Sequence, residues 1–393
     1  MKPIPTVTRF LQSFAIIFVA LYTLSAGASD QKPLNDSAKN RIQKAKAPAS
    51  HGHAGTSKRT QRNKNSAPRK PETIGPMYAH RPEAMQAADG IAQRLGLDAQ
   101  WVRQAIGQAR YMPGIARAIS PPPVGTVKNW TVYRSRFIDP VRINAGVKFW
   151  RDNRETLERA EQQTGVPAAI IVGIIGVETI YGQQVGTYRV MDALTTLAFD
   201  FPTQHPRAKE RAAYFLSELE AFLALTQRTG TDPLALRGSY AGAMGLPQFM
   251  PSSWTKYAVD FDGDGRTDLF HSAADVIGSV ANYFKAFQWR AGMPTHYAVR
   301  LTAEGADKAE LLAPDIRPTF SAATMVAKGA ELDISAMQHD GPLALVELQD
   351  GERPPLYLAG TENFYAITRY NWSSYYALAV IELGQEVTAA MSK

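Results

Sequence analysis

Apolar and polar residues recur at helical spacing along most of the chain beyond residue 73. The spacing predicts a helical region over residues 81–109, interrupted at Gly90 and Gly96, and one long surface helix over residues 140–164 that ends at Gly165. Another helix is predicted over residues 207–228, with an apolar stripe formed by Tyr214, Phe215, Leu219, Phe222 and Leu223. The pattern therefore predicts a mainly helical protein.

The most apolar predicted helix runs from residue 168 to about residue 181. Because it is apolar nearly all round, it should be buried at the centre of the fold. It contains one acidic residue, Glu178, and the nearest acids on either side in the sequence are Glu161 and Asp192. The aliphatic neighbours of Glu178 would withdraw its carboxyl group from water and thereby raise its pKa.

Two interpretations of Glu178 follow from the residues alone. A carboxyl group that stays protonated near neutral pH can act as a general acid and protonate the bridging oxygen of a glycosidic bond. Alternatively, Glu178 is a structural residue paired with Arg189 or with a tyrosine hydroxyl. Glycosidases normally use two carboxylates, and no second one is evident near Glu178. A catalytic role would thus favour a substrate that supplies the second group, such as the N-acetyl oxygen of an aminosugar.

After Gly292 the pattern changes to short alternating runs with β-branched and aromatic residues. Such runs occupy residues 296–305, 343–360 and 363–371, and they predict a small β-rich region over about 293–360. Residues 373–391 return to helical spacing.

Residues 260–271, DFDGDGRTDLFH, match the loop of an EF-hand, with acids at positions 1, 3, 5 and 9 and Gly265 at position 6. His271 stands at position 12, where a standard loop has a bidentate glutamate, so Asp275 is expected to close the site. A plain Asp-Gly turn without an ion is the alternative. The predicted ligands of a structural Ca²⁺ ion are Asp260, Asp262, Asp264, the backbone carbonyl of Arg266, and Asp275.

Composition adds limits on function. The 393-residue chain has no cysteine, which excludes disulfides, thiol nucleophiles, cysteine-ligated zinc and a lipidated cysteine. Residues 1–28 have a basic start, an apolar stretch and an Ala-Gly-Ala end, and they predict a cleaved secretory signal or an uncleaved anchor. Residues 1–72 hold 13 basic and 3 acidic side chains. We expect residues 29–72 to be a disordered basic linker, and its lack of aromatic residues argues against nucleic acid as a partner.

Several stretches, taken in order, resemble one known family. They are GVETIYG, YRVMDALTTLAFDFP, FLSELEAFL, GSYAGAMGLPQFMPSSWTKYAVDFDGDG, DVIGSVANYF and TENFYAITRYNWSSYYALAVIELGQ. Over roughly residues 75–390 they are similar to the lytic murein transglycosylase B family of peptidoglycan-cleaving enzymes. The resemblance implies a mainly α (α+β) fold, with a lysozyme-like helical core, a flanking helical domain and a small β-rich domain.

The resemblance also implies an activity. Glu178 corresponds to the family's catalytic acid/base, which cleaves the MurNAc-β-1,4-GlcNAc bond without water and leaves a 1,6-anhydromuramic end. A peptidoglycan hydrolase similar to goose-type lysozyme and a non-catalytic wall-binding protein are the alternatives. The candidate substrate-binding residues are Ser239, Tyr240, Gln248, Tyr370 and Asn371.

The predicted organisation follows from these patterns together. We expect a helical domain over residues 73–159 with the C-terminal helix 376–393, a catalytic core over 160–292 completed by 361–375, and a β-rich domain over 293–360. The expected location is the periplasm and the expected partners are peptidoglycan glycan strands, with cell-wall synthases as further candidates. Membrane attachment is expected only if the N-terminal segment stays uncleaved.

Overall fold

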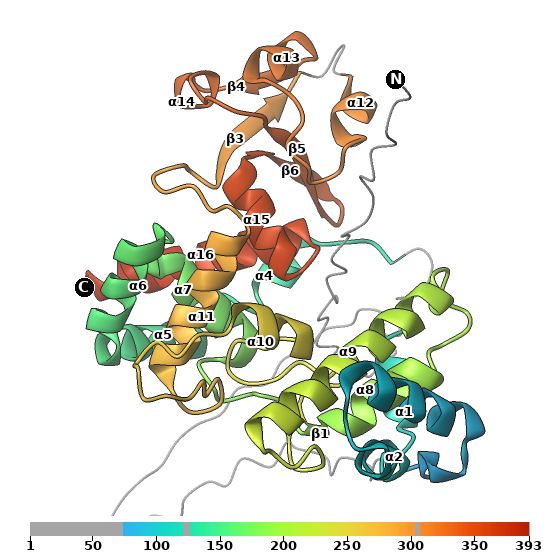
Figure 1. The fold of residues 1–393 in the computed structure, drawn as a ribbon. Coiled ribbons are helices and arrows are strands. Elements are labelled where there is room, and N and C mark those ends of the chain that lie inside the picture. Colours follow the sequence, from blue (N-terminus) through green and yellow to red (C-terminus); the bar gives the residue numbers. More distant parts are fainter. Residues whose placement is uncertain (1–73, 121–125, 303–306, 393) are drawn as a thin grey trace, which may run out of the picture. The chain divides into compact units, whose positions relative to one another are not determined.

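The computed structural model describes residues 74–120, 126–302 and 307–392. The predicted signal or anchor at residues 1–28 and the predicted linker at residues 29–72 lie outside the described residues. The described part is mainly helical and contains two small antiparallel sheets, one of two strands and one of four, which confirms the predicted fold class (Figure 1).

The helices of the first three quarters of the chain are η1 (Tyr78–His80), α1 (Pro82–Leu95), α2 (Ala99–Gly107), α3 (Pro113–Ala118), α4 (Trp130–Arg134), α5 (Pro140–Asp152), α6 (Arg154–Thr164), α7 (Ala168–Thr179), α8 (Val190–Phe199), α9 (Ala208–Thr229), α10 (Pro251–Tyr257) and α11 (Ala273–Ala286). They are followed by α12 (Lys308–Leu312), α13 (Ala322–Ala327), α14 (Ile334–Met337), α15 (Glu362–Tyr370) and α16 (Ser374–Met391). The strands are β1 (Tyr188–Arg189), β2 (Arg237–Gly238), β3 (His296–Leu301), β4 (Ala330–Leu332), β5 (Ala344–Asp350) and β6 (Arg353–Gly360).

The predicted long helix over residues 140–164 is wrong, because the chain forms two helices, α5 and α6, that meet at Asn153. At the break the Asn153 backbone leaves helical geometry, with φ −122° and ψ 23°, and both its N–H, at 3.1 Å, and its side chain, at 2.8 Å, donate to the carbonyl of Phe149. Gly165, with φ 71°, ends α6 as predicted. Of the two predicted breaks further upstream, Gly96 ends α1, whereas Gly90 lies inside that helix.

Residues 363–371 also differ from the alternating pattern that their sequence suggested. Residues 363–370 belong to helix α15, whose first turn begins where the Thr361 side chain accepts a hydrogen bond from the N–H of Asn363 at 3.1 Å, and Asn371 follows its end in extended conformation. Phe364 and Ile367 are fully buried on one face of this helix. Residues three apart lie on the same face of a helix, so these aromatic and β-branched residues can also form the buried face of a helix whose N-terminus is capped.

The predicted β-rich region contains a four-stranded antiparallel sheet in the order β4-β3-β6-β5. Strands β5 and β6 form a hairpin that turns at Gly351, where φ is 69°. Because side chains alternate along a strand, Leu345 joins a small core within this lobe while Val346 and Leu348 belong to the large helical core. Helices α12 and α13 pack on β5 and β4 (Figure 1).

Helix α7 is the centre of the helical core. It packs against α5, α6, α11 and α16, which surround it in Figure 1. The domain boundary predicted at residue 160 falls inside α6, and the one predicted at residue 376 falls inside α16. Each of these helices is therefore continuous across a predicted boundary. The division into domains remains a prediction.

Within the described ranges, no single helix combines the length and apolar character needed to cross a membrane. The bent pair α6 and α7, with 116° between its members, passes the same criterion of length and composition when taken together.

Candidate active site

Glu178 stands in the last turn of α7. The helix begins after Pro167, where a carboxylate oxygen of Glu161 accepts a hydrogen bond from the N–H of Ala168 at 2.9 Å. It ends at Ile180, whose backbone is left-handed with φ 51°. The aliphatic residues around Glu178 in the sequence are buried, whereas Glu178 itself is only half-buried. Its carboxyl group therefore lies at the edge of the apolar core and remains open to solvent.

Helices α7 and α16 approach closely because each has a glycine at the contact. A Cβ atom added to Gly173 would lie 2.2 Å from the carbonyl oxygen of Val380, and one added to Gly384 would lie 2.2 Å from that of Ala169. Positions 169 and 173 of α7 thus face positions 384 and 380 of α16, which means that the two helices run antiparallel. The same register brings the start of α16 to the last turn of α7.

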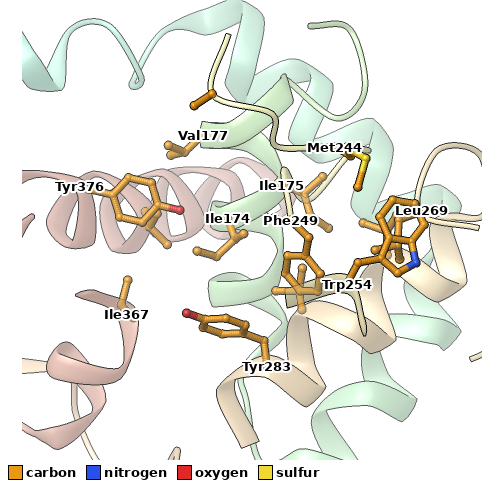
Figure 2. Close-up of a cluster of buried hydrophobic side chains, with 14 of the residues drawn as sticks. Ile174, Ile175, Val177, Met244, Phe249, Trp254, Leu269, Tyr283, Ile367 and Tyr376 are labelled. Atoms are coloured by element: carbon orange, nitrogen blue, oxygen red, sulfur yellow. The ribbon is translucent and has the colours of Figure 1, made fainter. Parts of the chain in front are cut away.

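At that point Tyr376 is the hydrogen-bond partner of Glu178. Its hydroxyl donates to Glu178 Oε1 at 2.6 Å, although the two residues are 198 positions apart in the chain. Figure 2 shows the Tyr376 ring directing its hydroxyl from α16 toward α7. No described residue donates to the other oxygen, Oε2, which is left for a ligand.

The surroundings of Glu178 favour its protonated form. Burial raises the pKa of Glu178 to about 7, and the hydrogen bond from Tyr376 opposes part of that rise. The negative end of the α7 dipole acts in the same direction as burial, because it disfavours a carboxylate in the last helical turn. A carboxyl group with this pKa can both donate and accept a proton near neutral pH.

Two further tyrosines lie within electrostatic range of Glu178. Burial and the negative charge of Glu178 both raise the pKa of Tyr133, on α4, and of Tyr370, on α15. The rings of Tyr370 and Tyr376 stack with centroids 6.4 Å apart and an interplanar angle of 13°. Neutral phenol groups therefore surround the carboxyl group.

The alternative interpretation, in which Glu178 is a structural residue paired with Arg189 or with a tyrosine hydroxyl, agrees with the structure only in part. The tyrosine contact is present, but Arg189 pairs with Asp192 at 2.6 Å and not with Glu178. Asp200 pairs with Arg81 at 3.2 Å. Asp192 and Asp200, the first two acids after α7 in the sequence, are thus already engaged, which is consistent with the catalytic interpretation of Glu178.

Thr179 joins two loops at the end of α7. Its hydroxyl donates to the carbonyl of Leu246 at 2.9 Å and accepts from the N–H of Gly182 at 3.1 Å. Ile180 and Tyr181 have φ angles of 51° and 54°. A left-handed conformation costs a residue with a side chain about 1–2 kcal/mol, so the fold holds the chain after Glu178 at an energetic cost.

Gln248, a predicted substrate-binding residue, lies in the loop that Thr179 contacts. Its Nε2 donates to the carbonyls of Gly245 at 2.8 Å and Val185 at 3.2 Å. These bonds hold together the loops on either side of the α7 terminus. The backbone of Gln248 is also left-handed, with φ 51°, and its role as a sugar contact remains a prediction.

Ser239 and Tyr240 follow strand β2. The Ser239 Oγ accepts hydrogen bonds from the N–H groups of Ala243 at 3.0 Å and Ala241 at 3.3 Å, which leaves its hydroxyl proton to be donated. Burial raises the pKa of Tyr240 to about 12, and the nearby Arg211 opposes that rise. Within the described part of the chain, neither residue makes a side-chain hydrogen bond to Glu178, and their role as sugar contacts remains a prediction.

Tyr370 and Asn371 lie at the junction of α15 and α16. The Tyr370 hydroxyl donates to the carbonyl of Pro247, so its polar atom is already engaged. Asn371 is 4% exposed, and its Oδ1 has no partner among the described residues. The structure brings Tyr370 beside Tyr376 and Glu178, whereas the contact of Asn371 with a glycan remains a prediction.

The predicted calcium ligands are brought together in part. Carboxylate oxygens of Asp260, Asp262 and Asp264 lie within 4.8 Å of one another, and all three residues are exposed. The carboxylate of Asp260 accepts hydrogen bonds from the N–H groups of Gly263 at 2.7 Å and Gly265 at 2.8 Å, which folds the loop around it. Three converging carboxylates are the oxygen donors that a hard divalent cation prefers, so these residues fit the predicted ion.

Asp275 is not one of those three. It is 1% exposed, and its two oxygens accept from the N–H groups of Phe261 and Asp268, both at 2.7 Å. It therefore ties both ends of the loop to α11. The carbonyl of Arg266 and the carboxylate of Asp275 remain predicted ligands.

Sequence reasoning missed Tyr133 and Tyr376. Both are tyrosines in helices with ordinary apolar patterns, and one of them, Tyr376, is 2% exposed and looks like a core residue. The close packing that brings Tyr376 to Glu178 depends on Gly173 and Gly384. A small residue on each of two apolar helices is the only local sign of that packing.

A mainly helical fold with two small sheets, and one half-buried glutamate held by a tyrosine hydroxyl, define a lysozyme-like enzyme of the glycan-cleaving class. Residues 80–385 match the family model described as the transglycosylase SLT domain, and this chain belongs to that family.

Known relatives agree. The chain is 41% identical over 325 residues to membrane-bound lytic murein transglycosylase B of Escherichia coli (strain K12), covering 81% of this chain and 86% of the relative. Soluble lytic transglycosylase SltB1 of Pseudomonas aeruginosa is 41% identical, with a TM-score of 0.71 over 79% of this chain and 100% of that structure. The Escherichia coli lytic transglycosylase Slt35 in complex with calcium is 39% identical, with a TM-score of 0.70 over 82% of this chain and 97% of that structure.

A more distant structure, SltB3 of Pseudomonas aeruginosa in complex with NAG-NAM-pentapeptide, is 31% identical, with a TM-score of 0.62 over 77% of this chain and 79% of that structure. These likenesses confirm the predicted family and the lysozyme-like fold class.

Proposed function

We propose that this protein is a peptidoglycan lytic transglycosylase that cleaves the MurNAc-β-1,4-GlcNAc bond and leaves a 1,6-anhydromuramic end. The observation that carries the proposal is the state of Glu178, a half-open carboxyl group with a pKa of about 7 and one oxygen free of protein partners. Membership of the transglycosylase SLT family supports the same reaction.

In the first step, protonated Glu178 gives its proton to the glycosidic oxygen, the bond from that oxygen to C1 breaks, and the 2-acetamido oxygen bonds to C1. In the second step, the carboxylate of Glu178 takes the proton from the C6 hydroxyl, O6 bonds to C1, and the acetamido oxygen leaves. One carboxyl group thus acts as acid and then as base, and no water is consumed. A pKa of about 7 suits both steps at neutral pH.

Other residues hold the reacting groups. Tyr376 fixes one oxygen of Glu178, so that the other points to the substrate. We propose that Ser239 donates its hydroxyl proton and Gln248 offers its Oε1 to polar groups of the sugars. Tyr240, Tyr370 and Asn371 would complete the glycan contacts. In each case, hydroxyl and amide groups match the hydrogen-bonding groups of a sugar, and a tyrosine ring can stack on its apolar face.

Product analysis tests the reaction. Purified sacculi digested by the wild type should release muropeptides lighter by one water than the products of hydrolysis, and Glu178→Gln should release them about 1,000-fold more slowly. Reducing muramic ends would instead identify a hydrolase. Equal wall turnover by both proteins would identify a wall-binding protein without catalysis.

We further propose that Asp260, Asp262 and Asp264 hold a structural Ca²⁺ ion, together with Arg266 and Asp275. The converging carboxylates support this, as does the calcium complex of Slt35. Bound calcium would neutralise the acids and stabilise the loop before α11. Removing calcium with a chelator should lower the melting temperature by several degrees, and Asp264→Asn should abolish that difference. An unchanged melting temperature would rule out the ion.

We infer that the protein acts in the periplasm on glycan strands, with cell-wall synthases as candidate protein partners. The similarity to a membrane-bound murein transglycosylase supports this location. Fractionation of cells that express the full chain, followed by detection in periplasmic and membrane fractions, tests both the location and the fate of residues 1–28.

A further inference from the structure

The tip of the hairpin formed by β5 and β6 contacts α4, which lies outside the sheet. Asp350 and Asn129 pair there as an isolated antiparallel bridge, and the N–H of Gly351 donates to the carbonyl of Lys128 at 3.1 Å. A Cβ atom at Gly351 would lie 2.6 Å from Asn129 Nδ2, so the glycine permits this close approach. The hairpin tip is thus fitted to the start of α4.

The side chain of Asp350 completes this contact. Its Oδ1 accepts from the N–H of Thr131 at 2.7 Å and its Oδ2 from the Thr131 hydroxyl at 3.0 Å, although the two residues are 219 positions apart. The Nε of Arg353 is 3.1 Å from Oδ2. The N–H of Thr131 lowers the pKa of Asp350, and the Thr131 hydroxyl and Arg353 act in the same direction, against desolvation. Asp350 is therefore a carboxylate with both oxygens on the first turn of α4.

Helix α4 has five residues and depends on such contacts. A helix of this length is unstable in water on its own, because its few hydrogen bonds do not offset the entropy of fixing the backbone. Asn129 caps it by accepting from the N–H of Val132 at 2.9 Å. Arg134, in its last turn, pairs with Glu382 of α16. Asp350 thus attaches the N-terminal end of α4, and Arg134 attaches the C-terminal end.

Tyr133 connects α4 to the environment of Glu178. Its ring packs edge-on against Tyr375 with centroids 5.6 Å apart, and the next residue, Tyr376, is the hydrogen-bond partner of Glu178. Burial and the charge of Glu178 both raise the pKa of Tyr133, so the phenol and the carboxyl group are close enough to interact. Burial also raises the pKa of Glu178, so any side chain that keeps water from this carboxyl group affects its strength as an acid.

Other charged or titratable groups near α7 are held by contacts outside the hairpin. Arg142 of α5 donates from Nε to the carbonyl of Gly176 at 3.1 Å and pairs with Asp139 at 2.9 Å. Further groups, each with a hydrogen-bond partner outside the hairpin, are Glu161 on α6, Tyr283 on α11, Tyr370 on α15 and Tyr376 on α16. A change in the side chain of Asp350 therefore reaches Glu178 through α4 and Tyr133.

We propose that Asp350 is a positioning residue for Glu178, which holds α4 so that Tyr133 remains beside the acid. The proposal rests on the proposed function, because it assigns Asp350 to the same reaction. When the carboxylate is removed, the start of α4 loses its attachment, Tyr133 moves away and water reaches Glu178. The carboxyl group then becomes a stronger acid, so that less of it is protonated at neutral pH, where it must donate a proton.

The pH dependence of kcat/KM for anhydromuropeptide release tests the proposal. In Asp350→Ala the alkaline fall of kcat/KM should move about one pH unit toward acid, so the ratio of kcat/KM at pH 7 to that at pH 5 should drop about fivefold. A merely structural loss would lower both values by the same factor and leave the ratio unchanged. Asp350→Asn keeps one acceptor for the N–H of Thr131 and should give a smaller shift. An unchanged ratio in Asp350→Ala would overturn the proposal.

Two variants are matched controls. Asp333 accepts from the N–H of Ala336 at 2.8 Å and caps α14, another short helix of the same lobe, so Asp333→Ala should leave the ratio unchanged. Tyr375→Phe removes a different bond of the hairpin, from the Tyr375 hydroxyl to the carbonyl of Gln349 at 2.9 Å, and should also leave it unchanged. A change in either control as large as that in Asp350→Ala would contradict a role exerted through α4.

Tyr133→Leu tests the intermediate step. It should reproduce the acid shift, and adding Asp350→Ala should shift the profile no further, because the same side chain has already been removed. Additive shifts would mean that Asp350 does not act through Tyr133.

A stability measurement separates this proposal from the proposed function, because it needs no substrate. The raised pKa of Glu178 costs stability at pH 8 and not at pH 5, so Glu178→Gln should raise the melting temperature at pH 8. In the Asp350→Ala background this gain should fall to about half or less, and Asp350→Asn serves for the same comparison if the alanine variant does not fold. Equal gains in both backgrounds would overturn the role of Asp350. A wild type that releases no anhydromuropeptides would instead overturn the proposed function and leave this comparison valid.

Discussion

Glu178 and Glu218 are two glutamates whose pKa is raised by burial, yet the fold treats them in opposite ways. Glu218, on α9, is 2% exposed and accepts from both the N–H and the hydroxyl of Ser252, at 2.9 Å and 2.6 Å. Glu178 is half-buried and has one partner, Tyr376.

Their positions relative to helix dipoles also differ. Ser252 is in the first turn of α10, so the carboxylate of Glu218 faces the positive end of that helix. Glu178 stands at the negative end of its own helix, where a carboxylate is disfavoured. A raised pKa alone therefore does not identify a catalytic acid. An open oxygen and an unfavourable place for the charge distinguish the reactive glutamate from the structural one.

The largest expected effect separates the two residues by activity. Glu178→Gln should lower kcat/KM for release of anhydromuropeptides about 1,000-fold, because the amide cannot donate the proton. Glu218→Gln is the matched control and should stay within a few-fold of the wild type per folded molecule. Comparable losses of kcat/KM in both variants would contradict the assignment of Glu178 as the reactive glutamate and Glu218 as the structural one.

The next prediction concerns stability, for which Glu218 is the more important of the two glutamates. Glu218→Ala should lower the free energy of unfolding by about 2–3 kcal/mol, because it leaves the part-buried donors of Ser252 without their acceptor. Urea unfolding monitored by circular dichroism measures this loss. A change below about 0.5 kcal/mol would show that water replaces the carboxylate at no cost.

A third prediction concerns pH. The folded pKa of Glu178, about 7, lies above the unfolded reference of 4.5, so its contribution to stability is fully present below pH 4.5 and is lost as pH rises through 7. Glu178→Gln should therefore be more stable than the wild type by about 2 kcal/mol at pH 8, and close to it at pH 5. Melting temperatures at the two pH values measure the difference. Glu155→Gln, at an exposed site on α6, controls for the loss of a charge.

The smallest expected effect tests the tyrosine. Tyr376→Phe removes the hydrogen bond that lowers the pKa of Glu178, so the fall of kcat/KM at alkaline pH should move to higher pH. The rate should drop about tenfold, as expected for one lost bond to a charged group. Tyr375→Phe removes a hydroxyl that donates to the carbonyl of Gln349 at 2.9 Å and should leave the pH profile in place. An unmoved profile in Tyr376→Phe would contradict the assigned role.

The parts of the site that carry a local sequence signal were predictable. Glu178 is conspicuous as a lone acid in an apolar run, and the acids of residues 260–264 have the spacing of a metal loop. The helical class follows from the spacing of apolar residues, but the break at Asn153 is a local change of backbone angles, to φ −122° and ψ 23°, that the spacing does not show. For residues 363–371, alternating residue types fit a strand and a helix equally, and capping by Thr361 decides for the helix.

Contacts between distant segments had no such signal. Tyr376 reaches Glu178 through the packing of α7 on α16, and Glu218 finds its partner Ser252 at the start of another helix. In the sequence, both Tyr376 and Glu218 look like ordinary members of amphipathic helices. Only the folded arrangement shows which acid is open and which is neutralised.

The meeting of Gly173 with Val380 and of Gly384 with Ala169 has a consequence for timing. The helix that completes the environment of Glu178 is made long after the acid, because Tyr376 follows Glu178 by 198 positions in the chain. A nascent or C-terminally shortened chain contains the acid long before it contains Tyr376, and α7 then has a bare apolar side where α16 belongs. The proposed wall-cutting activity can therefore begin only after α16 has been synthesised and has docked on α7.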